Sequence, residues 1–198
     1  MDFLKLITSL KILNIGIISF GDIIRSLLET NDDFAKKYRA SLARGDLIED
    51  SKAIEIFQIE MDKIIKEKSP QMVIIDGFCR SVPQIGYAAD NGYLSENSIV
   101  FMIEASLETC LDRFLHRKKK SVHRLIDAEI ETFHKRYHLH LDTAPALRAM
   151  FKETTCKLID VNGEGEIPDH SAREIKDKLF PVFVSMAKKS MGLESIHA

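Results

Sequence analysis

The chain has 198 residues, of which 45% are hydrophobic and 29% are charged, values that are ordinary for one globular domain with a real core. Its formal net charge is -2 and its sequence pI is about 6.4, whereas proteins that bind nucleic acids or membrane surfaces through bulk charge are strongly basic. We therefore expect no nucleic-acid partner and no membrane partner, and any bound anion must be held by a local cluster of cations.

The cysteines and the N-terminal residues bear on the cellular compartment. Cys79, Cys110 and Cys156 lie far apart and form no Cys-x-x-Cys pair, so we interpret them as reduced thiols. Residues 1–20 are rich in apolar side chains, but lysines interrupt them and no small-residue cleavage site follows. No stretch approaches the roughly 18 apolar residues that span a bilayer. We expect a cytoplasmic protein.

The hydrophobic pattern predicts helices that alternate with short buried strands. In chain order the predicted elements are helix 4–13, strand 15–19, helices 22–29, 33–43 and 51–68, strand 72–76, helix 83–91, strand 98–104, helices 107–115, 128–140 and 144–152, strand 156–161 and helix 172–189. Residues 116–124 form the most irregular stretch, because this cationic run has no apolar periodicity.

This alternation predicts an α/β fold, a doubly wound parallel sheet with helices on both faces. Ligands bind to such sheets beyond the carboxyl ends of the strands. Those ends carry residues 19–22 (SFGD), residues 76–80 (DGFCR) and Glu104. The architecture therefore directs attention to the first two segments.

Residues 76–80 (DGFCR) have the side chains of a phosphate site. Asp76 can position Mg2+ through water, because Mg2+ prefers carboxylates together with retained waters. Gly77 permits a sharp turn, and the forked guanidinium of Arg80 matches phosphate oxygens. The alternative is that Asp76 caps the next helix and Arg80 is solvated, and the five residues alone do not decide between these.

Two other segments are also suited to anions. Residues 18–25 (ISFGDIIR) place a glycine-containing turn at the start of a helix, whose free N–H groups attract an anion, and Arg25 follows one turn later. Arg113 and Arg117 lie one helical turn apart, where like charges repel unless an anion lies between them. Taken alone, each segment is more simply a capped helix or a solvated charged face.

Together, these segments resemble the adenylate kinase family, in its order and spacing. They are residues 18–25, 44–48 (RGDLI), 76–80 with Pro83 and Gln84, Arg113 with Arg117, 124–127, Arg136 and 143–145 (TAP). Each string is weak alone, but together they cover nearly the whole chain. The resemblance implies a P-loop NTPase-like fold and a nucleoside monophosphate kinase of the short-lid form, which converts ATP and AMP to two ADP in nucleotide biosynthesis with Mg2+ as cofactor.

The resemblance also implies the site residues. Those implied to bind AMP are Phe20, Arg25, Asp46, Leu47, Ile48, Gly77, Phe78, Cys79, Arg80, Gln84, Arg124 and Arg136. Those implied to bind ATP are Arg113 and Arg117, and Asp76 would order Mg2+ through water. The implied catalytic residues are Arg80, Arg113, Arg124 and Arg136. Residues 1–198 would form one monomeric domain, with residues 19–48 as a mobile monophosphate-binding arm and residues 117–124 as a short lid.

The chemistry of phosphoryl transfer agrees with this set of residues. The reaction needs alignment of two nucleotides and positive charge around the transferred group, and it needs no general base when the acceptor is a phosphate. Closure of the lid would exclude water.

Within this resemblance, Gln84 favours AMP over UMP or CMP as the acceptor. Three residues differ from the usual family residue: Phe20 stands where the family usually has threonine, Cys79 where it has proline and Ala128 where it has an acid.

The chain departs from the family in its donor site. The family begins with a strand and a Gly-x-x-x-x-Gly-Lys loop that holds the donor phosphates, and these 198 residues contain no such motif. We favour a truncated reading of an enzyme; the alternative is a pseudokinase that binds a nucleotide as a regulatory or scaffold protein. As given, the chain is expected to be a poor enzyme, because loss of one preorganised donor costs about 100- to 1000-fold in rate.

Three histidines, His134, His138 and His140, suggest a metal site as a further alternative, since the first two lie one helical turn apart. Zinc would need another ligand and supporting hydrogen bonds, and no matching cysteine or acid is evident. We therefore favour histidines that face solvent on a helix.

Overall fold

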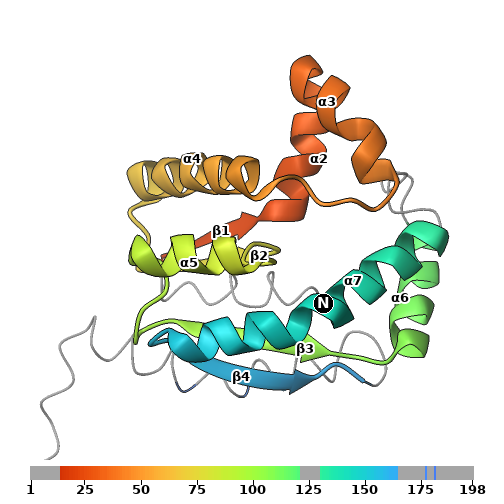
Figure 1. Ribbon diagram of the computed structural model, residues 1–198. Helices are drawn as coiled ribbons and strands as arrows, with labels where there is room; N and C mark the ends of the chain where they lie inside the picture. Colours follow the sequence, from red (N-terminus) through yellow and green to blue (C-terminus); the bar gives the residue numbers. More distant parts are fainter. Residues whose placement is uncertain (1–13, 121–129, 165–176, 178–180, 182–198) are drawn as a thin grey trace, which may run out of the picture.

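The computed structural model of the protein describes residues 14–120, 130–164, 177 and 181 (Figure 1). Its strands are β1 (Ile15–Ser19), β2 (Met72–Asp76), β3 (Ile99–Glu104) and β4 (Lys157–Asn162). Its helices are α2 (Phe20–Thr30), α3 (Asp32–Ala43), α4 (Asp50–Lys68), α5 (Val82–Asp90), α6 (Leu107–Lys120) and α7 (Ile130–Glu153). None of these helices has both the length and the apolar composition that crossing a bilayer requires. The helices predicted at residues 4–13 and 172–189 lie outside the described residues, apart from residues 177 and 181.

The described strands form two parallel pairs. β1 pairs with β2, from Ile15 opposite Met72 to Ser19 opposite Asp76, and β3 pairs with β4 in the same sense. The arrows of β1, β3 and β4 point the same way in Figure 1, so their carboxyl ends lie on the side where α2 and α6 begin. Parallel strands alternating with helices confirm the predicted α/β fold.

Alternate side chains of the strands separate into two apolar faces, as the pleat requires. On one face, Ile18 and Val73 pack into a cluster with α2, α3 and α4, and Met102 packs into a cluster with α5 and α7. On the other face, Val161 packs with Ile15, Met72, Ile74, Ile99, Phe101 and Ile159. Because this last cluster draws on all four strands, the two pairs contribute to one layer.

Three aromatic rings join the ends of β1 and β2 to α4. Phe57 on α4 is fully buried and stacks on Phe78 with ring centroids 4.0 Å apart. Phe78 in turn contacts Phe20, the first residue of α2, at 5.7 Å. Each such ring pair contributes about 0.5–1.5 kcal/mol beyond the area it buries. The rings therefore fix the start of α2 relative to the turn that follows β2.

Two predictions about the elements were wrong. Residues 128–140 and 144–152 were predicted as two helices, but α7 runs without a break and contains Pro145. Proline removes one backbone hydrogen bond, and the buried contacts of Ala144, Leu147 and Phe151 with β3 and α5 hold the helix on both sides of it. The irregular stretch predicted from residue 116 is helical as far as Lys120, because lysine and arginine are good helix formers.

Candidate functional site

The turn after β2 brings together residues from two of the predicted segments. Gly77 and Cys79 have φ of 85° and 59°, both in the left-handed region. A Cβ atom on Gly77 would lie 3.2 Å from Nη2 of Arg80 and 3.5 Å from Cβ of Phe20. Glycine is favoured here by its backbone angle, and its missing Cβ lets the guanidinium of Arg80 lie close to the turn.

Gln84 holds the backbone of this turn. Its Oε1 accepts a hydrogen bond from the backbone N–H of Arg80 at 2.9 Å, and its Nε2 donates to Oδ1 of Asp50 at 2.8 Å. Ser81, the N-cap of α5, donates to the same carboxylate oxygen at 2.6 Å. Gln84 is only 5% exposed. The bond to Asp50 uses one of the two protons of the amide nitrogen, and the contacts of both amide atoms fix this side chain against the turn.

The start of α2 forms the neighbouring part of the candidate site. Ser19 and Asp76 are register partners, so α2 and the turn after β2 leave the same edge of the strand pair. Arg25 forms an ion pair with Asp22 one turn earlier, and its guanidinium lies 3.3 Å from the Cβ position that Gly21 leaves empty. The side chain of Arg25 is 32% exposed, and so it is open to a ligand from solvent.

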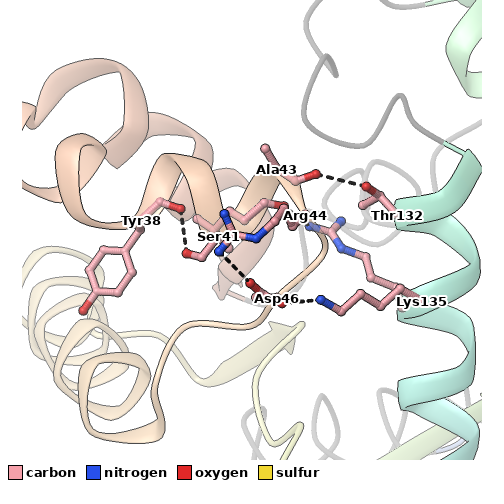
Figure 2. Close-up of polar contacts among 9 residues, drawn as sticks. Tyr38, Ser41, Ala43, Arg44, Asp46, Thr132 and Lys135 are labelled. Atoms are coloured by element: carbon pink, nitrogen blue, oxygen red, sulfur yellow. Dashed lines mark hydrogen bonds and ion pairs between the residues drawn. The ribbon is translucent and has the colours of Figure 1, made fainter.

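The end of α3 contacts α7 (Figure 2). Oγ1 of Thr132 donates to the carbonyl oxygen of Ala43 at 3.0 Å. Nη2 of Arg136 donates to the carbonyl oxygen of Leu42 at 3.4 Å. Arg136, predicted to bind the AMP phosphate, therefore lies at the end of the predicted monophosphate arm.

The segment after α3 carries the other residues predicted to bind AMP. Asp46 forms ion pairs with Lys135 and, at 3.4 Å, with Arg44. The hydrogen bond from Lys135 lowers the pKa of Asp46 from its ordinary value of 3.8. Leu47 is exposed, and Ile48 packs against the cluster around α3 and α4. The segment thus runs from the surface contact with α7 into the core.

Arg113, one of the two residues predicted to bind ATP, lies on α6 beside the end of β4. Nη2 of Arg113 donates to the carbonyl oxygen of Gly163, immediately after β4. The next residue, Glu164, accepts hydrogen bonds from the hydroxyl of Thr109 and the backbone N–H of Ser106, and these bonds lower its pKa. The carboxylate of Glu164 therefore occupies the N-terminal end of α6, beside the guanidinium of Arg113.

A Mg2+ site at Asp76 is compatible with the residues present. Asp76 ends β2 and is exposed. In the part of the chain that the structure describes, no three His, Cys, Asp or Glu side chains are grouped as metal ligands. Mg2+ does not require such a group, since it binds through one or two carboxylates, retained waters and substrate phosphates. Within α7, Nδ1 of His138 lies 2.8 Å from the carbonyl oxygen of His134, one turn earlier.

The predicted arginines that the structure describes lie beside different elements. Arg25 and Arg80 lie at the edge where β1 and β2 end, Arg113 lies at the end of β4, and Arg136 lies at the end of α3. Arg124 and the side chain of Arg117 lie outside the described residues. Their convergence on one phosphate group stays a prediction.

Sequence reasoning missed three residues that shape this region: Asp50, Thr132 and Lys135. Thr132 is only 5% exposed, and a polar residue on the apolar side of a helix is a signal that sequence reasoning can use. Asp50 has a weaker signal, as an acid in the first turn of a helix. Lys135 has none, because its partner lies 89 residues away.

The model of the AAA domain family matches residues 5–134 of the chain. The chain belongs to the AAA domain family. The similar proteins include adenylate kinases from Flavobacterium psychrophilum, Prochlorococcus marinus and Nautilia profundicola. In that order, they are 29%, 24% and 26% identical to this chain. The alignments cover 81%, 82% and 81% of this chain, and 83%, 82% and 81% of the respective relatives.

These relatives place the AAA-family chain with the adenylate kinases and confirm the resemblance drawn from its motifs. Each alignment covers about four fifths of both proteins, so the similarity extends well beyond one shared motif. The alternating parallel strands and helices of the described residues agree with a P-loop NTPase-like fold of this type. The chain is accordingly a member of a nucleotide kinase family.

Proposed function

We propose that the protein is a nucleoside monophosphate kinase whose acceptor is AMP and whose donor is ATP. It would act as a monomer in the cytoplasm. The observation that carries the proposal is the turn after β2, in which Gly77 makes room for the guanidinium of Arg80 beside the start of α2. The similarity to proteins named adenylate kinase supports AMP as the acceptor.

In this proposal the monophosphate binds between the arm, residues 19–48, and the turn after β2. Arg80 and Arg25 would bind the phosphate, because a guanidinium stays charged and matches two phosphate oxygens at once. Gln84 would use its second amide proton for the adenine. The backbone of residues 46–48 would line the other side of the base, and Phe20 and Phe78 would support the site from the core.

The donor would bind on the side of β4 and α6. Arg113 and Arg117 would contact the ATP phosphates, and Arg124 and Arg136 would contact the transferred group and the AMP phosphate. Mg2+, held by Asp76 through water, would supply positive charge at the phosphates when bound. The short lid, residues 117–124, would close over the donor and exclude water, so that the phosphoryl group passes to AMP.

A second candidate function is nucleotide binding without efficient transfer. It is favoured by one observation, that these 198 residues contain no Gly-x-x-x-x-Gly-Lys motif. That loop supplies several N–H donors and a lysine to the donor phosphates. Since each preorganised donor accounts for about 100- to 1000-fold in rate, we propose that these 198 residues bind AMP but transfer phosphate slowly.

Calorimetric titration with AMP tests the acceptor site. Wild type should bind AMP, and Arg80→Ala should bind it about ten- to a hundredfold more weakly, since a hydrogen bond to a charged group contributes about 1.5–3 kcal/mol. Lys63→Ala removes an exposed cation from α4 and serves as the control with unchanged affinity. Equal affinity in Arg80→Ala and wild type would refute the monophosphate assignment, and rapid ADP formation by the 198 residues would refute the slow-transfer proposal.

A further inference from the structure

We propose that Asp46 and Lys135 form a latch that holds the monophosphate arm against α7 and thereby positions Arg136 at the acceptor site. The ion pair joins residues 89 positions apart and links the segment after α3 to α7 (Figure 2). The role assigned to the latch rests on the proposed function of the arm. Asp46 and Lys135 would be positioning residues, because they act through Arg136 and the arm.

The contact between the arm and α7 is built into both elements. The last carbonyl groups of a helix have no partner within that helix. At the end of α3 the carbonyls of Leu42 and Ala43 accept hydrogen bonds from Arg136 and Thr132, so α7 contributes to the cap together with the backbone N–H of Gly45, which also donates to Leu42. Thr132 is only 5% exposed, so leaving its hydroxyl without a hydrogen-bond partner would destabilise the folded protein.

Gly45 allows the close approach that these hydrogen bonds need. Its φ of 85° turns the chain after α3, and a Cβ atom there would lie 3.2 Å from both Cγ2 and the carbonyl oxygen of Thr132. The same Cβ atom would lie 3.6 Å from Cδ of Lys135. The aliphatic part of the lysine thus lies along the turn and carries its ammonium group to Asp46.

The ion pair sets the position of two parts of the acceptor site at once. Asp46 begins the segment proposed to line the AMP base, and Lys135 precedes Arg136 on α7. When the latch is closed, Arg136 is held at the end of α3. A protein that already has its arm in place binds ligand more tightly, since apparent affinity scales with the fraction in the competent state.

The geometry also limits the size of the effect. The side chains of Lys135 and Asp46 are 50% and 33% exposed, so the pair is screened by water and salt. Exposed pairs of this kind typically change an equilibrium by about two- to fivefold. The latch is therefore expected to shift the arm between open and closed, not to decide whether the protein folds.

Charge reversal with rescue tests the latch. Lys135→Glu should raise the Kd for AMP about two- to fivefold or more, Lys135→Arg should leave it near the wild-type value, and Asp46→Lys combined with Lys135→Glu should recover most of the loss. Lys52→Ala is the matched control, because it breaks an exposed ion pair with Glu55, 2.7 Å long, within α4. Equal Kd values in wild type and Lys135→Glu, or a double variant that binds AMP no better than Lys135→Glu, would overturn the proposal.

Hydrogen exchange without nucleotide separates this proposal from the proposed function. The backbone amides of Gly45 and Asp46 donate to Leu42 and Ser41, and they should exchange faster in Lys135→Glu than in wild type and Lys52→Ala. Unchanged exchange would show that no latch exists, whatever AMP does. If wild type fails to bind AMP, the proposed function and the positioning role both fail, even where exchange shows that the ion pair holds the arm.

Discussion

Cys79 adopts a φ of 59°, although it carries a side chain and the left-handed region favours glycine. It lies between two residues of the candidate site, Phe78 and Arg80, and packs against two core clusters. Burial raises the pKa of its thiol to about 12. The adenylate kinase family usually has a proline at this position, and a proline ring fixes φ near -65°. The turn that carries Arg80 therefore has a backbone that the usual family residue cannot adopt.

Cys79→Pro is expected to lower the free energy of unfolding by more than about 1 kcal/mol, because a proline placed where its φ is not allowed costs more than its entropic benefit. Cys79→Ala is the matched control, since alanine can keep the backbone angle and loses only the thiol. Urea denaturation of both variants measures the difference. A proline variant as stable as the alanine variant would show that the turn relaxes freely to the usual family conformation.

The connection from α3 to α4 depends on Glu49. Its carboxylate accepts hydrogen bonds from Nζ of Lys37 at 2.7 Å and from the hydroxyl of Tyr38 at 2.5 Å. These two bonds, with that from Lys37 the larger cause, lower the pKa of Glu49 from 4.5 to about 2. Glu49 is also the N-cap residue of α4. One carboxylate thus ties the arm helix to the start of the next helix.

The stability contributed by Glu49 should depend on pH. Because its pKa is lower in the folded protein than in the unfolded chain, the contribution is complete above pH 4.5 and is lost as the pH falls toward 2. Glu49→Gln should therefore be less stable than wild type at pH 7, and the difference should shrink steadily between pH 4.5 and 3. Urea denaturation across this range measures it. A difference that does not change with pH would rule out the ionised carboxylate as its source.

For the helices and strands, the sequence predicts local structure well and long-range contacts poorly. β1 and β2 have the predicted bounds because each is an apolar run that ends at a polar or glycine residue. α7 was divided wrongly because Pro145 breaks helices in isolation, while here buried neighbours compensate for the lost hydrogen bond. The position of Thr132 on its helix could have marked it as a buried polar residue, but nothing local reveals that its partner is the carbonyl of Ala43, since the two elements meet only after folding.

Across the whole molecule, α7 links the β3–β4 pair to the arm (Figure 1). Near its C-terminal end, Arg148 forms ion pairs with Glu104 at the end of β3 and Asp160 in β4. Near its N-terminal end, Thr132 and Arg136 contact the end of α3. A single rigid helix therefore connects the proposed donor side with the proposed acceptor side. The family resemblance indicated which residues matter, but the contacts that hold them became visible only in the structure.

The central claim is that cationic side chains from separate elements form one site for the phosphate of a nucleoside monophosphate. The most direct measurement is a pair of calorimetric titrations of the wild-type chain, one with AMP and one with adenosine, each at low and at high salt. The account predicts that AMP binds at least about tenfold more tightly than adenosine and that added salt reduces this advantage, because the phosphate provides most of the attraction. Equal affinities for AMP and adenosine, or an advantage that salt leaves unchanged, would contradict it.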